Sequence, residues 1–165
     1  MLDALSVARR VVRRYGRGAS LHRREVDRLA DACRLEVHTS VLDMDAPAVL
    51  LPPLAGRFRL VLAPGLGPAL RRYITLHEIG HVLAGDAEEI TLLRSRDPLP
   101  EAEDVADLFA LLGVLEDRDF LGGPDAVDAA IRRRVPLEDR GWQMHRVPRL
   151  ARKVWRLRSR LTRGA

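Results

Sequence analysis

The stretch RYITLHEIGHVL, residues 72–83, decides the fold expected of this chain. Apolar side chains flank two histidines and one glutamate on nearly every side of a helix predicted from Ala69 to Leu83. A helix that is apolar all round is buried, and polar groups in a buried helix need partners. The pattern therefore predicts a central buried helix whose polar residues form a site, rather than an exposed helix with two solvated histidines.

The two histidines of this stretch, His77 and His81, are four residues apart. This spacing places them on one helix face, one turn apart, where both imidazoles can reach a single zinc ion. Glu78 follows the first histidine and so flanks the metal instead of binding it. From there its carboxylate can take a proton from a water molecule that the zinc activates. The spacing therefore predicts a catalytic zinc site with Glu78 as the base.

A catalytic zinc takes three protein ligands and keeps one open position, so a third ligand is needed. Ala87 stands where the extended metzincin motif has its third histidine, which excludes that class. The remaining candidates are five glutamates: Glu88, Glu89, Glu101, Glu103 and Glu116. Glu103 is favoured because Asp107 lies one turn later, where it can accept the free N–H of a zinc-bound histidine. Glu101 is its main rival.

The rest of the chain predicts an α+β fold. Further helices are expected at residues 2–15, 21–34, 101–115 and 125–133, with a basic helix at the C-terminus. Short strands are expected at residues 35–42, 48–51 and 57–62. The loops between them are too short for helical crossovers. We therefore expect a small, mostly antiparallel three-stranded sheet.

Charge is distributed unevenly along the sequence. Residues 86–119 contain eleven acids and three bases, whereas residues 130–165 contain twelve bases and two acids. The formal net charge of +5 therefore describes the C-terminal tail rather than the whole surface. The single cysteine, Cys33, excludes an internal disulfide. The first 18 residues lack the unbroken apolar run of a signal peptide or membrane span, so we expect a cytoplasmic protein with no membrane partner.

Two segments together resemble a known family. Residues 72–83 look like the motif helix of the ImmA/IrrE metallopeptidases, and residues 103–112, EDVADLFALL, resemble that family's second signature, Glu-x-x-Ala-Asn/Asp-x-Phe-Ala. The resemblance implies a gluzincin-like fold, with His77, His81 and Glu103 as zinc ligands and Glu78 as catalytic base. It also implies a substrate: a helix-turn-helix transcriptional repressor, cleaved in a stress or mobile-element response.

This sequence departs from the family pattern in three places. Gly113 and Val114 stand where the family usually continues with Met-Pro, and Asp107 replaces the commoner asparagine. The region after Gly122 matches no part of the family pattern. These departures affect the identity of the substrate more than the metal site.

Three functional hypotheses follow. The first is a site-specific zinc endopeptidase, which also needs a group to stabilise the oxyanion, and Tyr73 and His145 are the candidates. The second is a regulatory module that contains zinc and binds a repressor without cleaving it. The third is a nucleic-acid binder. It is disfavoured because the sequence has no helix-turn-helix, zinc finger or basic patch interleaved with aromatics, so direct sequence-specific DNA binding is not expected.

The C-terminal tail has a pattern but no motif. We expect a zinc metallopeptidase domain over residues 1–135 and a basic helical extension over residues 136–165. From Arg149 to Leu161 a narrow apolar stripe follows helical spacing: Leu150, Val154, Leu157 and Leu161. Either the stripe docks on the domain and leaves the arginines in water, or the arginines bind a partner.

Overall fold

The computed structural model describes residues 21–42, 46–84, 100–137 and 142–163. Its elements are α2 (Arg23–Ala32), β1 (Leu35–Thr39), β2 (Ala48–Leu54), β3 (Arg57–Leu62), α3 (Pro68–Ala84), α5 (Pro100–Val114), α6 (Asp117–Phe120), α7 (Gly123–Arg134), η1 (Trp142–Arg146) and α8 (Val147–Arg163). The predicted α+β architecture is confirmed. The helix predicted at residues 2–15 lies outside the described residues.

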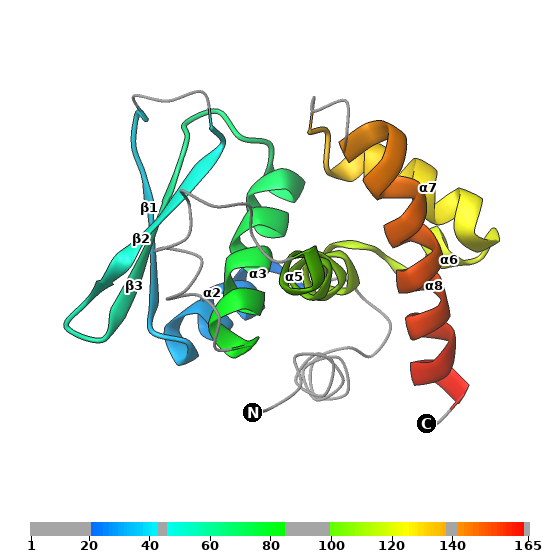
Figure 1. The fold of residues 1–165 in the computed structure, drawn as a ribbon, viewed down its shortest axis with the longest axis horizontal. Coiled ribbons are helices and arrows are strands. Elements are labelled where there is room, and N and C mark those ends of the chain that lie inside the picture. The colour runs from blue at the N-terminus through cyan, green and yellow to red at the C-terminus, as the bar shows by residue number, and fades with distance from the viewer. Residues whose placement is uncertain (1–20, 43–45, 85–99, 138–141, 164–165) are drawn as a thin grey trace.

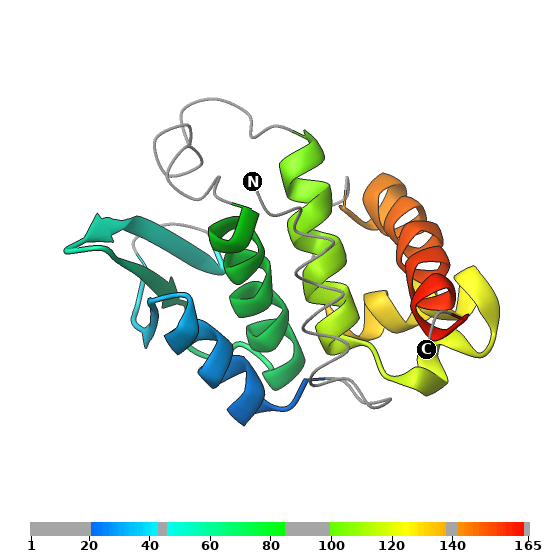
Figure 2. The same cartoon turned by 90° about the horizontal axis from the view of Figure 1, so that it is seen from below.

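The elements are stacked in layers (Figure 1). The sheet is covered on one side by α2 and α3, α5 lies beside α3, and α7 and α8 lie beyond α5. Figure 2 shows α5 between α3 and α8 in a second view. One hydrophobic cluster runs through these layers, from Leu60 in the sheet through Leu76 and Leu111 to Leu150 in α8.

The sheet order is β1-β3-β2. Strands β2 and β3 are antiparallel and joined by a tight turn at Ala55 and Gly56, whose φ angles are 51° and 72°. Such left-handed pairs belong to two-residue hairpin turns. The ladder is irregular between Leu51 and Leu54, where two prolines lack N–H donors. Strand β2 continues through these prolines because an edge strand does not need every donor.

The prediction of a mostly antiparallel sheet is wrong for one of the two strand pairs, because β1 pairs with β3 in parallel, with Leu35 opposite Phe58 and Thr39 opposite Leu62. A parallel neighbour needs a crossover connection, and this connection is usually a helix. Here β2 is itself the return path, since it runs back between the two strands in sequence and then pairs on the far side of β3. The sheet is therefore mixed.

Helices α3 and α5 approach each other closely at the centre of the molecule. A Cβ built on Gly80 of α3 would lie 3.0 Å from the Cα of Ala106 in α5. A second close approach occurs where a Cβ on Gly113 would lie 2.5 Å from a side-chain methyl carbon of Leu76. Small residues at these crossings let α5 come near enough for its carboxylates to reach the histidines of α3.

Helix α8 packs against α5 and α7. Its stripe residues Leu150 and Val154 are fully buried, and Leu157 is half-buried. The side chain of Leu161 lies outside the described residues. The stripe therefore docks on the rest of the protein, as the first interpretation of the tail expected. The hydrophobic cluster spans the predicted boundary at residue 135, and the division into two domains stays a prediction.

The docked tail does not leave all of its bases in water. Several ion pairs join the basic C-terminal part to the acidic segment before it: Arg149 and Lys153 with Asp104, Arg146 with Asp107, Arg158 with Asp117, and Arg133 and Arg134 with Asp119. The charge asymmetry of the sequence is thus partly neutralised inside the molecule.

Candidate metal centre

Helix α3 positions the first two ligand candidates. His77 and His81 lie one turn apart, and their Nε2 atoms are 3.0 Å apart. The His81 side chain is 1% exposed and that of His77 is 16% exposed. The neighbours Leu76 and Ile79 are fully buried and hold the helix in the core. The two imidazole nitrogens therefore converge at a point that is mostly sheltered from solvent.

Helix α5 brings a carboxylate to the same point. The Oε2 atom of Glu103 lies 3.5 Å from Nε2 of His77, and its Oε1 atom lies 3.4 Å from Nε2 of His81. One ligand atom from each residue lies within 4.8 Å of the other two. Two imidazoles and a carboxylate in this arrangement can hold a metal ion.

None of the other ligand candidates is placed at this point by the described residues. Glu88 and Glu89 lie outside the described residues, as does the side chain of Glu101. Glu116 is described, and it pairs with Arg118 and Arg134 at the end of α5 away from the histidines. Of the five candidate glutamates, Glu103 is the only one whose described side chain reaches the histidine pair.

Asp107 lies behind His77, on the side away from the ligand atoms. The Nδ1–H of His77 donates to Oδ1 of Asp107 across 2.9 Å, which leaves Nε2 available as a ligand. The hydroxyl of Tyr73 donates to the same oxygen across 2.5 Å. These contacts fix the orientation of the imidazole before any metal binds.

The electrostatics of the centre reflect this crowding of opposite charges. Burial alone would lower the pKa of His77, but hydrogen bonds to Asp107 and Glu103 outweigh it and raise that pKa to about 10. Burial would raise the pKa of Glu103, yet its contacts with His77 and His81 hold it well below its usual range. The carboxylates thus favour positive charge at this centre.

Glu78 lies beside this cluster and faces a cavity. The residue is buried, and its Oε2 atom has no hydrogen-bond partner among the described residues. The cavity has a volume of about 230 Å³ and is lined by residues from five separate segments: Pro47, Ala48, Tyr73, Ile74, His77, Glu78, Glu103, Asp107, Leu137 and Arg146. A buried carboxylate oxygen without a partner is costly. Its position at the cavity suits a ligand or a water molecule that it would accept a hydrogen bond from.

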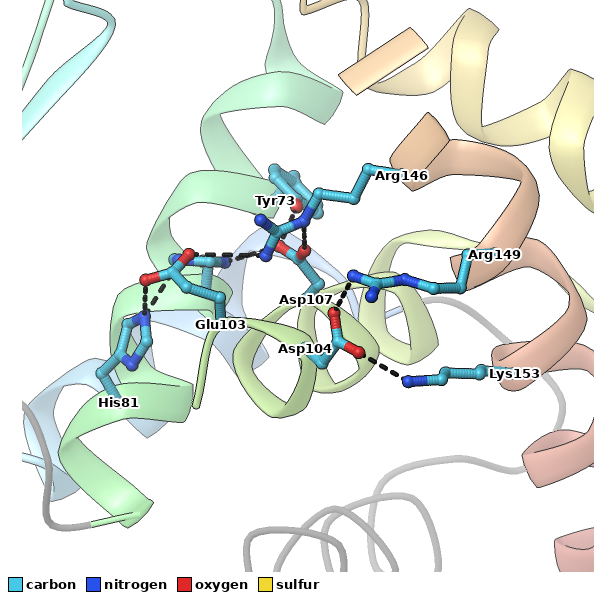
Figure 3. Close-up of polar contacts among 9 residues, drawn as sticks. Tyr73, His81, Glu103, Asp104, Asp107, Arg146, Arg149 and Lys153 are labelled. Atoms are coloured by element: carbon cyan, nitrogen blue, oxygen red, sulfur yellow. Dashed lines mark hydrogen bonds and ion pairs between the residues drawn. The ribbon is translucent and has the colours of Figure 1, made fainter. Parts of the chain in front are cut away.

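The two candidates for oxyanion stabilisation lie in different surroundings. Tyr73 lines the cavity, although its hydroxyl is directed to Asp107. His145 in η1 is exposed and does not line the cavity. The neighbouring residue Arg146 does line the cavity, and the Nε–H of Arg146 donates to Oδ2 of Asp107 across 2.6 Å (Figure 3). Sequence reasoning missed Arg146, since it is one of many arginines in the tail.

No protein-family model, no curated protein and no solved structure matches the chain. Among the described residues, no helix has both the length and the apolar character needed to cross a membrane.

Proposed function

We propose that the protein is a cytoplasmic zinc-dependent endopeptidase with His77, His81 and Glu103 as metal ligands and Glu78 as general base. One observation carries the proposal: three ligand atoms converge within 4.8 Å beside a buried glutamate oxygen that has no partner among the described residues. The donor set of two imidazole nitrogens and one carboxylate oxygen suits zinc, and three protein ligands leave a position open. When bound, the metal would polarise a substrate carbonyl and make a water molecule more acidic.

The protein's own residues would perform the remaining steps. Glu78 accepts a proton from the attacking water molecule and later donates it to the leaving nitrogen. Asp107 holds His77 in the tautomer that presents Nε2 to the cluster. Burial keeps bulk water away, which strengthens these electrostatic effects.

The shape of the site supports a peptide substrate. Strand β2 lies at an edge of the described sheet, and its first residue, Ala48, lines the cavity. An edge strand offers backbone groups to which an extended peptide can pair. Part of the cavity lining is apolar, from Pro47, Ile74 and Leu137, and an uncharged side chain can pack against such residues.

The resemblance to the ImmA/IrrE metallopeptidases supports the choice of substrate. A helix-turn-helix transcriptional repressor is therefore the partner that we propose, cut at one site in a stress or mobile-element response. No direct binding of specific DNA sequences is part of this proposal.

Glu78→Gln tests the proposal, because it removes the base and keeps the size of the side chain. The zinc-loaded variant should bind the repressor and retain zinc while its turnover falls by roughly 10²–10⁴-fold. Glu36→Gln, at a half-buried residue of β1 that does not line the cavity, is the matched control and should cleave normally. Cleavage by Glu78→Gln within a few-fold of the wild type would refute the mechanism. Binding of repressor by the wild type without any cleavage would favour the regulatory module instead.

A further inference from the structure

The C-terminal tail places one cation inside the metal centre. Arg146 is the last residue of η1, directly before α8. Its Nε lies 2.6 Å from Oδ2 of Asp107, and a terminal nitrogen of its guanidinium lies 3.5 Å from Oε2 of Glu103. Figure 3 shows the guanidinium lying between these two carboxylates. A single side chain therefore contacts both the carboxylate ligand and the residue that orients His77.

Two further bases of the same segment, which bind a different carboxylate of α5, also hold Arg146 in place. Arg149 and Lys153 follow on α8, and each lies 2.5 Å from a different oxygen of Asp104. Asp104 is buried on the side of α5 that faces α8, whereas Glu103 and Asp107 face α3 (Figure 3). Arg146 thus binds carboxylates on one face of α5, while Arg149 and Lys153 bind a carboxylate on another. Docking of the tail does not depend on Arg146 alone.

Asp107 needs such a partner for a physical reason. Its side chain is 2% exposed, and a buried carboxylate is stable only when charge and hydrogen bonds compensate it. Tyr73 and His77 donate to one oxygen, and Arg146 donates to the other. With both oxygens occupied, the carboxylate cannot rotate away from His77.

We propose that Arg146 is a positioning residue of the metal centre, which orients Glu103 and Asp107 so that the ligand atoms of Glu103 and His77 converge. The tail is then a part of the site and not only a docked helix. This inference rests on the zinc-binding part of the proposed function and not on peptide cleavage.

Zinc affinity tests the inference, measured on the full chain by competition with a chromophoric chelator. Arg146→Gln should weaken zinc binding by roughly 10–100-fold, the usual effect of losing a residue that supports metal ligands. Arg146→Lys, which keeps the charge but loses the planar fork, should lose less. The matched control is Arg149→Gln, which loosens the same docked segment and should bind zinc within about threefold of the wild type. Circular dichroism of each metal-free variant checks that it is folded.

A double-mutant cycle separates positioning from a general structural effect. If Arg146 acts through Asp107, then Arg146→Gln should weaken zinc binding much less in the Asp107→Asn background than in the wild type. Wild-type zinc affinity in both Arg146 variants would overturn the inference, and so would an equal loss in Arg149→Gln. Because the measured quantity is zinc binding, a protein that binds zinc in this way but cleaves no peptide would overturn the proposed function alone.

Discussion

Helices α3 and α8 are each 17 residues long and lie on opposite sides of α5, but they differ in what surrounds their polar groups. In α3 the polar residues Glu78 and His81 are buried among apolar side chains. In α8 an apolar face is buried, and bases such as Arg152 and Arg156 remain exposed. Burial of a polar group is costly, so it indicates a site more strongly than any number of exposed charges.

The two helices nevertheless depend on each other through α5. Helix α3 supplies two ligand candidates, and the segment before α8 supplies Arg146, which contacts the carboxylates that face those ligands. We therefore assign the proposed chemistry to α3 and α5, and we expect α8 to contribute stability and, through Arg146, alignment. Substitutions on the two sides should separate these contributions.

The largest effect on stability is expected from Leu150→Ala in α8. Leu150 is fully buried, so the variant leaves a cavity and should lower the free energy of unfolding by about 2–5 kcal/mol. Leu121→Ala is the control, since Leu121 is 86% exposed and its loss should cost less than about 0.5 kcal/mol. Chemical denaturation measures both. Equal free energies of unfolding for the two variants would mean that α8 does not stabilise the fold, which would contradict the role given to its buried face.

Gly80→Ala should have the next largest effect, because the added Cβ meets the backbone of Ala106 at 3.0 Å. Moving α5 away should cost about 1–3 kcal/mol of unfolding free energy. It should also weaken zinc binding roughly tenfold, since Glu103 moves with α5. Gly67→Ala is the control, because no atom lies within 4 Å of a Cβ built there. Unchanged stability and zinc affinity in Gly80→Ala would contradict the close helix approach.

A smaller difference is expected between two arginines of α8. Arg149→Met removes one of the two partners that the buried Asp104 has among the described residues, and it should cost about 1 kcal/mol of unfolding free energy. Arg152→Met alters an exposed side chain and should change stability by less than about 0.5 kcal/mol. Thermal unfolding at matched ionic strength compares them. A larger loss in Arg152→Met would show that the exposed arginines have a structural role that the geometry does not explain.

Local patterns predicted the long elements of this fold well. The helix expected from Ala69 to Leu83 is α3, Pro68–Ala84, because its apolar surroundings and the proline before it mark both its nature and its start. The two short helical elements α6 and η1 were not predicted, since four or five residues are too few to show a period. The pairing of β1 with β3 was also missed, because strand order depends on contacts between segments that no local pattern encodes.

In the candidate site, too, the local relations were predicted and the contact between distant residues was missed. Spacing within one helix placed His77 beside His81, and Asp107 one turn beyond Glu103. Those relations are local, and the structure has all four residues in contact. The contact of Arg146 with Asp107 joins residues 39 positions apart. Its sequence neighbours include many arginines with other partners, so no local signal distinguished it.

Zinc content of the ligand variants tests the central claim most directly. Wild-type protein and a Glu101→Ala control, purified with zinc and dialysed, should each hold one zinc per chain by elemental mass spectrometry. Glu103→Ala should retain roughly a tenth of that or less, because a site with two histidines alone binds weakly. Full zinc occupancy in Glu103→Ala, together with loss in Glu101→Ala, would contradict the assignment of the third ligand and with it the account of the site given above.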